Sequence, residues 1–310
     1  MSDAPQPKPL HDPPLPDPLL PEGTRIDRLA TGGIWTEGPL WIPADRTVRW
    51  SDIPNDRILQ WDADTGETSV HRQGVEFTNG RALDADGSVI QCSHGRRRLE
   101  RESPDGTVEG IVSHWGDARL NSPNDVAIAA DGSYWFTDPD YGIVQPNEGH
   151  PGDREYGRRF VFRWSADDGL TPVITDIDQP NGIAFSPDGG TVYVTDTAAG
   201  LGDGPGHWIR AYDVRGAGAE RGRLFAVIDE GLPDGIAVDE RGRVWSSAGD
   251  GVHVFEPDGT EIRFIPVPEV VSNVCFGGDD GSDLFLTATT SLYRLRTSTR
   301  AAAPPNGSAR

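Results

Sequence analysis

Six polar residues recur along this chain, each at the start of a short apolar run. These residues, which we call the anchors, are Glu37, Asn79, Asn124, Asn181, Asp234 and Asn273, and they stand 42, 45, 57, 53 and 39 residues apart. All six side chains offer an oxygen atom, and none is a histidine or a cysteine. Oxygen-only ligation favours a hard cation, and Ca²⁺ typically takes about 6–8 oxygen ligands. If the fold brings the anchors together, two carboxylates neutralise a divalent charge while amide oxygens complete the shell.

For a single asparagine the ordinary explanation is turn formation, because Asn-Gly and Asn-Asp pairs are common in turns. That explanation suffices for Asn273 and extends to Asn79, but Glu37 has no such turn preference. The chain contains no G-x-S-x-G, H-E-x-x-H or Walker motif, so covalent serine chemistry is unsupported. Its only lysine, Lys8, lies outside the patterned region, which leaves the fold without a lysine for Schiff-base chemistry.

Each anchor opens a unit of candidate strands. After Asn124 the strands are VAI, YWFT, FVFRW and TPVITD, and after Asp234 they are IAV, VWSS, VHVFE and EIRFIPV, with turns such as ADG and EPDG between them. Helical periodicity is absent almost throughout the chain. Four antiparallel strands repeated every forty to fifty residues or so are the signature of a β-propeller blade. The sequence therefore predicts an all-β protein with six four-stranded blades.

The two ends of the repeat complement each other. The sixth unit contains only three candidate strands (VCF, LFLTA and LYRLR), and an orphan strand, TRIDRLA, precedes the first anchor. Joining this N-terminal strand to the last blade closes the ring and removes two exposed edges. A β-sandwich also spaces its strands regularly, but it explains neither the recurrent anchor nor the complementary ends. We expect a proline-rich extended segment over residues 1–21, the propeller over 22–297 and a disordered tail over 298–310.

Composition limits the classes of partner. The chain has 28 basic and 49 acidic residues, a formal net charge of −21, which argues against nucleic acid because such binders need a basic stripe. No apolar stretch approaches membrane-spanning length, so we expect no membrane partner. The N-terminus lacks the layout of a signal peptide, and we expect a cytoplasmic protein, or an exported one if a signal peptide preceded this chain. The sequence does not indicate the oligomeric state. Cys92 and Cys275 lie in strand-like runs and are expected to be buried thiols.

Further polar residues fall near the same end of the blades as the anchors. In a propeller the first strand of each blade lines the central channel, so the anchors should meet at one channel mouth. His94 follows the second strand of the second unit, although a lone histidine is as often structural as functional. Asp138 and Tyr141 begin the insertion that makes the third interval the longest, and long loops on a rigid scaffold often cover a site. Asn79, His94, Asp138 and Tyr141 are therefore candidate substrate contacts.

Several segments resemble motifs of the SMP-30/gluconolactonase/LRE family, namely EGPLW, LNSPNDV, FTDPDYG, PNGIAFSPD and LPDGIAVD, and HGRRRLER is similar to a segment of its gluconolactonase branch. The likeness covers roughly residues 25–295. It implies a six-bladed, Ca²⁺-dependent lactonase, with another divalent cation as the alternative. It also implies a metal shell of Glu37, Asn181 and Asp234, with Asn124 contacting the metal or the substrate and Asp234 transferring the proton. The family's animal branch has an arginine just before the equivalent of Asn124, where this chain has NSPN.

A cation at the channel mouth would polarise a carbonyl or phosphoryl oxygen and stabilise the oxyanion formed when water attacks. We therefore expect hydrolysis of sugar lactones such as glucono-1,5-lactone to the aldonic acid. The alternatives are a hydrolase of other lactones or organophosphates on the same face, a non-enzymatic binding propeller, and a strictosidine-synthase-like propeller, which would not need this oxygen shell. A carboxylate bound to a cation is a poor base. Either Asp234 binds through one oxygen and accepts the proton on the other, or solvent takes the proton.

Overall fold

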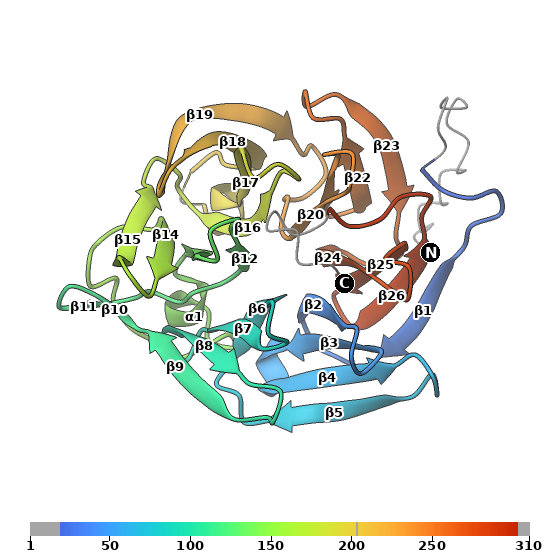
Figure 1. Cartoon of the computed structure of the whole chain (residues 1–310), viewed down its shortest axis with the longest axis horizontal. Coiled ribbons are helices and arrows are strands. Elements are labelled where there is room, and N and C mark those ends of the chain that lie inside the picture. Colours follow the sequence, from blue (N-terminus) through green and yellow to red (C-terminus); the bar gives the residue numbers. More distant parts are fainter. Residues whose placement is uncertain (1–18, 203, 303–310) are drawn as a thin grey trace, which may run out of the picture.

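The computed structural model describes residues 19–202 and 204–302. Six four-stranded antiparallel sheets are arranged around a common axis, and the chain passes from one blade to the next around the ring (Figure 1). In five of these sheets the strands stand in sequence order, from the inner strand beside the axis to the outer strand at the rim, and in the sixth the first strand of the chain is the outer one. The predicted six-bladed β-propeller is confirmed.

The blades follow one another in chain order. Blade one consists of β2 (Thr36–Ile42), β3 (Thr47–Asp52), β4 (Arg57–Asp62) and β5 (Thr68–Gln73), and blade two of β6 (Thr78–Leu83), β7 (Val89–Ser93), β8 (Arg98–Glu102) and β9 (Val108–Val112). Blade three consists of β12 (Val126–Ile128), β13 (Tyr134–Asp138), β14 (Phe160–Ser165) and β15 (Gly169–Ile174), and blade four of β16 (Pro180–Phe185), β17 (Thr191–Asp196), β18 (Trp208–Arg215) and β19 (Gly218–Val227). Blade five consists of β20 (Ile236–Val238), β21 (Val244–Ser247), β22 (Gly251–Phe255) and β23 (Glu261–Pro266).

Blade six combines the two ends of the repeat. It contains β24 (Val271–Gly277), β25 (Asp283–Ala288), β26 (Ser291–Arg296) and, as its outer strand, the N-terminal β1 (Ile26–Thr31). Strands β1 and β26 pair antiparallel, from Ile26 opposite Leu295 to Thr31 opposite Ser291. Figure 1 shows this closure as the blue β1 beside the red β26. The predicted ring closure by an N-terminal strand is confirmed.

Helical segments are short and lie between strands. They are the single 3₁₀ turn η1 (Ile53–Asn55), α1 (Tyr141–Val144) after β13, and α2 (Ala198–Leu201) after β17; a small hairpin of β10 (His114–Trp115) and β11 (Ala118–Arg119) precedes blade three. Within residues 19–202 and 204–302, no helix is both long and apolar enough to cross a membrane.

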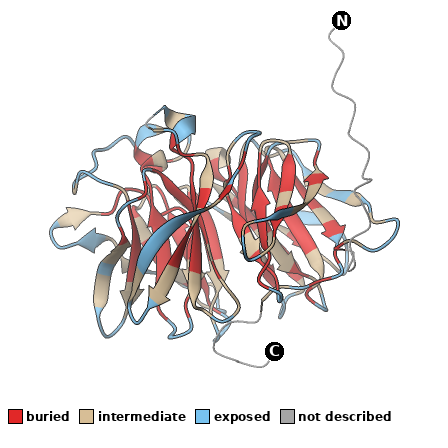
Figure 2. Cartoon of the chain, turned by 90° about the horizontal axis from the view of Figure 1, so that it is seen from above, coloured by how far each residue is buried: buried red, intermediate tan, exposed pale blue. Residues whose placement is uncertain are grey.

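Apolar packing between adjacent blades holds the ring together. Trp50, Trp135 and Trp245 are among the largest fully buried side chains, and Trp135 and Trp245 occupy matching positions in the second strands of blades three and five, opposite Ala127 and Ala237. Trp135 packs in one cluster with Ile183 and Val194 of blade four. Second strands such as β7 and β13 are buried throughout, whereas outer strands such as β5 and β9 contain no buried residue; Figure 2 shows the exposed residues at the edges of the blades and in loops. Burial of this apolar surface is the main force that favours the folded ring.

The inner strands are irregular where the anchors stand. A register shift lies at or beside the anchor in the pairings of β2 with β3, β6 with β7, β16 with β17 and β24 with β25. In blades three and five the regular inner strand begins only after the anchor, at Val126 and Ile236. An irregularity of this kind breaks the alternation of a strand and re-aims one side chain. The anchors are therefore free to point toward the end of the channel.

The described parts of the terminal segments contact the propeller. Leu19 is 1% exposed and packs in the cluster of blades five and six, and its carbonyl oxygen accepts a hydrogen bond from the backbone N–H of Ser298 (2.8 Å). Near the other end, Ala301 forms a β-bridge with Asp239 of blade five. Residues 1–18 and 303–310 of the expected terminal segments lie outside the described residues. The boundaries at 21 and 297 stay predictions about what the folded domain requires.

Candidate active site

Five of the six anchors line one cavity of about 180 Å³. Cavities that hold small molecules combine an apolar lining with a few convergent polar groups, and this cavity has both. The lining anchors are Glu37, Asn79, Asn124, Asn181 and Asp234. The other lining residues come from connections between strands and are Trp35, Ile53, Tyr141, Gln145, Glu148, Thr197, Gly200, Leu201 and Leu232.

A glycine follows four of the anchors and lets neighbouring blades approach closely. A Cβ at Gly38 would lie 2.5 Å from the carbonyl oxygen of Asn79, and one at Gly80 would lie 2.6 Å from that of Asn124. Cβ atoms at Gly182 and Gly235 would likewise overlap the next anchors around the ring, Asp234 and Asn273. Of these glycines only Gly38 has a positive φ (52°). Close approach, and not turn formation, therefore explains most of these anchor–glycine pairs.

Hydroxyl groups of the second strands fix the backbone of the next anchor. In three blades a Ser or Thr side chain donates a hydrogen bond to the anchor carbonyl of the following blade, which satisfies a buried acceptor. The pairs are Ser51 Oγ with Asn79 (3.0 Å), Thr137 Oγ1 with Asn181 (2.6 Å) and Thr195 Oγ1 with Asp234 (2.8 Å). The positions of these anchors are thus set by contacts from the preceding blades.

Glu37 is buried, and one of its carboxylate oxygens is held while the other is free. Oε2 accepts hydrogen bonds from the backbone N–H of Gly38 (2.7 Å) and from Nδ2 of Asn273 (3.0 Å). Oε1 has no hydrogen-bond partner within the described part of the chain. Burial is the main reason that the pKa of Glu37 rises to about 8, and the nearby charges of Asp125 and Glu148 add to the effect. Asn273 does not line the cavity, but it orients a residue that does.

The amides of three anchors form a hydrogen-bonded chain along the cavity. Asn79 Nδ2 donates to Asn124 Oδ1 (2.8 Å), and Asn124 Nδ2 donates to Asn181 Oδ1 (2.6 Å). Asn181 Nδ2 then donates to the hydroxyl of Tyr141 (3.3 Å). The buried Oδ1 of Asn79 has no partner among residues 19–202 and 204–302. Since buried polar atoms are nearly always paired, this orphan oxygen indicates a place for a ligand.

Asp234 reaches the cavity from the start of blade five. Its backbone N–H donates to Ser247 Oγ (3.1 Å), which fixes its main chain. Burial, followed by the charges of Glu37 and Glu148, raises the pKa of Asp234 well above its usual range. Among the described residues, the cavity is lined by these three acidic side chains and by no lysine, arginine or histidine. Several carboxylates enclosed together without a positive partner favour binding of a cation.

The cavity residues fit a hard divalent cation. In the described part of the chain no cluster of three or more His, Cys, Asp or Glu side chains could hold a metal by itself. A cation here would depend on Glu37 and Asp234 together with amide oxygens, a donor set suited to Ca²⁺. The free Oε1 of Glu37 and the unbalanced negative charge would each be satisfied by such an ion, and the unpaired Oδ1 of Asn79 is left for another ligand.

Of the five residues predicted to contact substrate, Asn79, Asn124 and Tyr141 line the cavity, and His94 and Asp138 do not. His94 is fully buried behind the lining. Its Nδ1 donates to the carbonyl oxygen of Glu148 (3.0 Å), because a carbonyl only accepts, and its Nε2 accepts from Nδ2 of Asn79 (3.4 Å). Burial lowers the pKa of His94 to about 4, so the ring is neutral near pH 7. His94 therefore supports two lining residues from behind.

Asp138 accepts hydrogen bonds from the backbone just before blade three. Its carboxylate accepts hydrogen bonds from the N–H groups of Asn121 (2.7 Å) and Ser122 (2.8 Å) and from the hydroxyl of Tyr156 (2.7 Å). Burial raises the pKa of Asp138 to about 7. Asp52 and Asp196 end the second strands of blades one and four and accept backbone N–H groups in the same way. The carboxylate at this position thus belongs to the repeat, and the structure does not bring it to the cavity.

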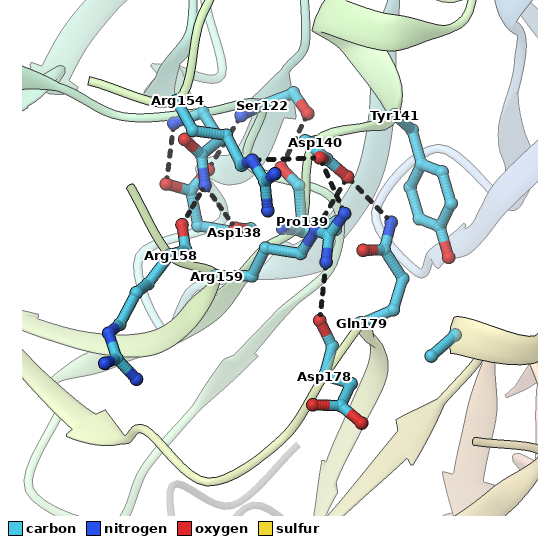
Figure 3. Close-up of polar contacts among 12 residues, drawn as sticks. Ser122, Asp138, Pro139, Asp140, Tyr141, Arg154, Arg158, Arg159, Asp178 and Gln179 are labelled. Carbon is cyan, nitrogen blue, oxygen red and sulfur yellow. Dashed lines mark hydrogen bonds and ion pairs between the residues drawn. The ribbon is translucent and has the colours of Figure 1, made fainter. Parts of the chain in front are cut away.

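The neighbouring Asp140 fastens the blade-three insertion to blade four (Figure 3). Arg159 donates through Nε and Nη2 to the two carboxylate oxygens of Asp140, both at 2.8 Å. Gln179 Nε2 also donates to Asp140 (3.1 Å), and Arg159 Nη1 donates to the carbonyl oxygen of Asp178 (3.1 Å). Asp140 directly precedes α1, so this network places Tyr141 over the anchors.

Sequence reasoning missed several lining residues. Trp35 and Leu232 each stand two positions before an anchor, so the repeat itself contains a signal for them. Glu148 stands in the irregular loop after α1, where no repeat pattern marks it.

The fold and the cavity define a class of protein: a six-bladed propeller with an acidic, oxygen-lined site where the inner strands meet. The sequence model of the SMP-30/Gluconolactonase/LRE-like region matches residues 35–290, and the chain belongs to this family. It is 30% identical over 305 residues to the gluconolactonase of Zymomonas mobilis, covering 91% of this chain and 84% of that protein. It is 32% identical over 266 residues to a pentonolactonase of Haloferax volcanii, covering 81% and 80%. A solved gluconolactonase structure from Xanthomonas campestris matches with a TM-score of 0.84 and 38% identity over 91% of this chain and 94% of the other.

Proposed function

We propose that this protein hydrolyses sugar lactones such as glucono-1,5-lactone to the aldonic acid, with a divalent cation, Ca²⁺ in the first place, as cofactor. The observation that carries the proposal is the convergence of Glu37, Asp234 and three anchor amides in one cavity, to which the described part of the chain contributes no basic residue. The relatives named as a gluconolactonase and a pentonolactonase support the substrate class.

When bound, the cation would supply Lewis-acid polarisation of the lactone carbonyl. Glu37, Asn181 and Asp234 would hold it, with Asn124 beside them. Asn273 and Gly38 keep Glu37 in one orientation, so that Oε1 stays available. Asp234 would accept the proton of the attacking water, and Asn79 and Tyr141 would orient the substrate hydroxyl groups.

Turnover of glucono-1,5-lactone, corrected for uncatalysed hydrolysis, tests the proposal. We expect activity to disappear after treatment with EDTA and to return when Ca²⁺ is added in excess. The melting temperature should rise with Ca²⁺, because a cation bound only to the native protein stabilises it by mass action. Activity that survives complete chelation would contradict the cofactor, and a protein that opens no aldonolactone would contradict the lactonase.

Lactones with fewer hydroxyl groups are a second candidate class. Ile53, Leu201 and Leu232 give the cavity an apolar wall whose side chains cannot hydrogen-bond to sugar hydroxyls. A comparison of kcat/KM between glucono-1,5-lactone and δ-valerolactone decides between the two classes. A phosphotriester in the same assay tests the organophosphate alternative.

A further inference from the structure

One carboxyl group in the cavity has no role among the cation-binding residues. Glu148 lines the cavity together with the anchors, but it comes from the loop after α1 and not from an inner strand. Within residues 19–202 and 204–302 its carboxylate has no hydrogen-bond or ion-pair partner. A carboxylate that stabilises the fold is normally paired with a cation or with N–H donors. The environment of Glu148 therefore suits a group that meets a ligand.

The backbone around Glu148 is fixed on several sides. Its carbonyl oxygen accepts the Nδ1 proton of His94 (3.0 Å), and its N–H donates to the carbonyl oxygen of Gln145 (3.3 Å). The next residue, Gly149, packs against Gly142 so closely that a Cβ would overlap the Gly142 carbonyl. A Cβ at Gly142 would in turn lie 2.6 Å from Cβ of His94. These contacts fix the backbone of Glu148 at the cavity, so that its carboxyl group starts from one place beside a bound ligand.

We propose that Glu148 is the general acid of this site and protonates the ring oxygen of the lactone as the ring opens. The inference rests on the proposed lactonase function. The oxygen of water bonds to the carbonyl carbon, the C=O electron pair moves onto the carbonyl oxygen, and the water proton goes to Asp234 or solvent. When that pair returns, the bond from the carbonyl carbon to the ring oxygen breaks. The ring oxygen keeps the bonding pair, takes the proton of Glu148 and becomes a hydroxyl group, and solvent reprotonates Glu148.

A proton donor is useful here because an aliphatic lactone expels an alkoxide, which is a strong base and a poor leaving group. Burial raises the pKa of Glu148 to about 7, so a large fraction of the group carries a proton near neutral pH. The charged groups that face it are Glu37 and Asp234, whose two negative charges balance one divalent cation. His94, which contacts its backbone, is neutral at this pH. Position, protonation and the missing partner thus agree on one role.

The test compares two leaving groups in the variant Glu148→Gln. Glucono-1,5-lactone expels an alkoxide and needs the proton, whereas dihydrocoumarin expels a phenolate that is stable without it. For the alkoxide substrate we expect kcat to fall by roughly 10²–10⁴-fold, the usual contribution of a general acid, and for the phenolate substrate by less than about tenfold. The matched control is Glu76→Gln, because Glu76 pairs with His150 nearby and does not line the cavity; both of its rates should stay unchanged.

Two further measurements separate an acid from a structural or ligating residue. The wild-type kcat on glucono-1,5-lactone should decline as the pH rises past about 7, because the acid loses its proton, and Glu148→Gln should lack this decline. Calorimetric Ca²⁺ affinity should be the same in Glu148→Gln and wild type. Glu148→Asp keeps an acid at a shorter reach and should recover part of the lost rate.

Three outcomes would overturn the assignment. Equal losses on the two lactones would show that the variant disturbs the site in general, and a weakened Ca²⁺ affinity would make Glu148 a ligand. If the Glu148→Gln enzyme has a normal kcat on glucono-1,5-lactone, Glu148 is not the general acid, but the proposed lactonase function still stands. A wild-type protein that opens neither lactone would instead remove the proposed function, and the inference with it.

Discussion

At the scale of the residue, two polar side chains of the candidate site each have one atom hydrogen-bonded to the protein and another atom without a partner among the described residues. Glu37 has one oxygen held by Gly38 and Asn273 and one oxygen free. Asn79 has its Nδ2 held by Asn124 and its Oδ1 unpaired. A side chain that is anchored through one atom loses little entropy when its other atom binds a ligand, so the site is ordered before a ligand arrives.

Metal binding and proton transfer at Asp234 can be separated by two isosteric variants. Asp234→Asn keeps one ligating oxygen but removes a charge and any basicity, and Glu37→Gln removes a charge from the same cavity. If Asp234 also accepts a proton, its variant should stay slower by roughly 10²–10⁴-fold even when the site is saturated with Ca²⁺. The measurement is kcat on glucono-1,5-lactone across a Ca²⁺ titration, with occupancy followed by calorimetry.

Glu37→Gln is the control in that experiment, because its carboxylate is held by Asn273 and is not expected to receive a proton from substrate. Saturating Ca²⁺ should bring it back toward the wild-type rate. If Asp234→Asn recovers to the same extent, both residues act only as ligands and solvent takes the proton of the attacking water.

The anchors were predictable from the sequence because the repeat puts one polar residue at the same point of every unit. Five of the six do meet in the cavity. Glu148 was not predictable, since it lies in a connection whose shape is set by packing among Gly142, Gly149 and His94. Asp138 does not line the cavity, and the sequence contained a sign of this: Asp52 and Asp196 stand at the matching points of the repeat, and all three carboxylates accept backbone N–H groups.

At the scale of the element, the inner strands join two requirements that conflict in a regular strand. Each must pair with its neighbour in the blade. Each must also point its anchor side chain toward the cavity, although the side chains of a regular strand point alternately to the two faces of the sheet. The register shifts at the anchors meet the second requirement, and the glycine that follows lets the next blade come close enough to present its own anchor. The distance between neighbouring anchors is therefore set by the backbone, through the register shifts and the glycines.

Gly182→Ala tests this spacing. A Cβ there would overlap the carbonyl oxygen of Asp234, so blades four and five would have to separate. We expect the free energy of unfolding to fall by about 1–3 kcal/mol, the usual cost of overpacking, and Ca²⁺ affinity to fall with it. Thermal or urea denaturation and calorimetry measure the two effects.

Gly218→Ala is the matched control, because its Cβ would meet nothing closer than 3.9 Å and its φ is not positive. This variant should match wild type in stability and in Ca²⁺ affinity. A Gly182→Ala protein that behaves like the Gly218→Ala protein would show that the close approach of the blades is not needed.

The strands were readable from the sequence because alternating apolar residues and Gly-containing turns mark them, and the strands expected after Asn124 and Asp234 are all present. The single-turn helices α1 and α2 were not readable. Each is too short to show a helical period, and tertiary contacts such as those of Asp140 hold the α1 turn in place.

At the scale of the whole molecule, a ring of blades must hold together the two ends of its chain. Strand β1 pairs with β26 over its whole length, so the first strand and the last lie in one sheet. Leu19 extends this junction: it is buried between blades five and six, and its carbonyl accepts from Ser298. Stability and the geometry of the cavity should therefore depend on a segment far from the anchors.

Nested truncations test the closure. Deleting residues 1–18 removes no contact that the structure describes and should leave the melting temperature unchanged. Deleting residues 1–21 also removes Leu19 and should cost roughly 1.5–3 kcal/mol, the value of one fully buried leucine side chain. Deleting residues 1–31 removes β1, leaves the edge of β26 exposed and should cause a larger loss of stability together with aggregation. Thermal denaturation, size-exclusion chromatography and Ca²⁺ affinity show whether stability and binding decrease in this order among the three proteins.

If the protein without β1 stays monomeric, melts like the full chain and binds Ca²⁺ equally well, the ring does not need its N-terminal strand, and the cavity is held by the blades alone.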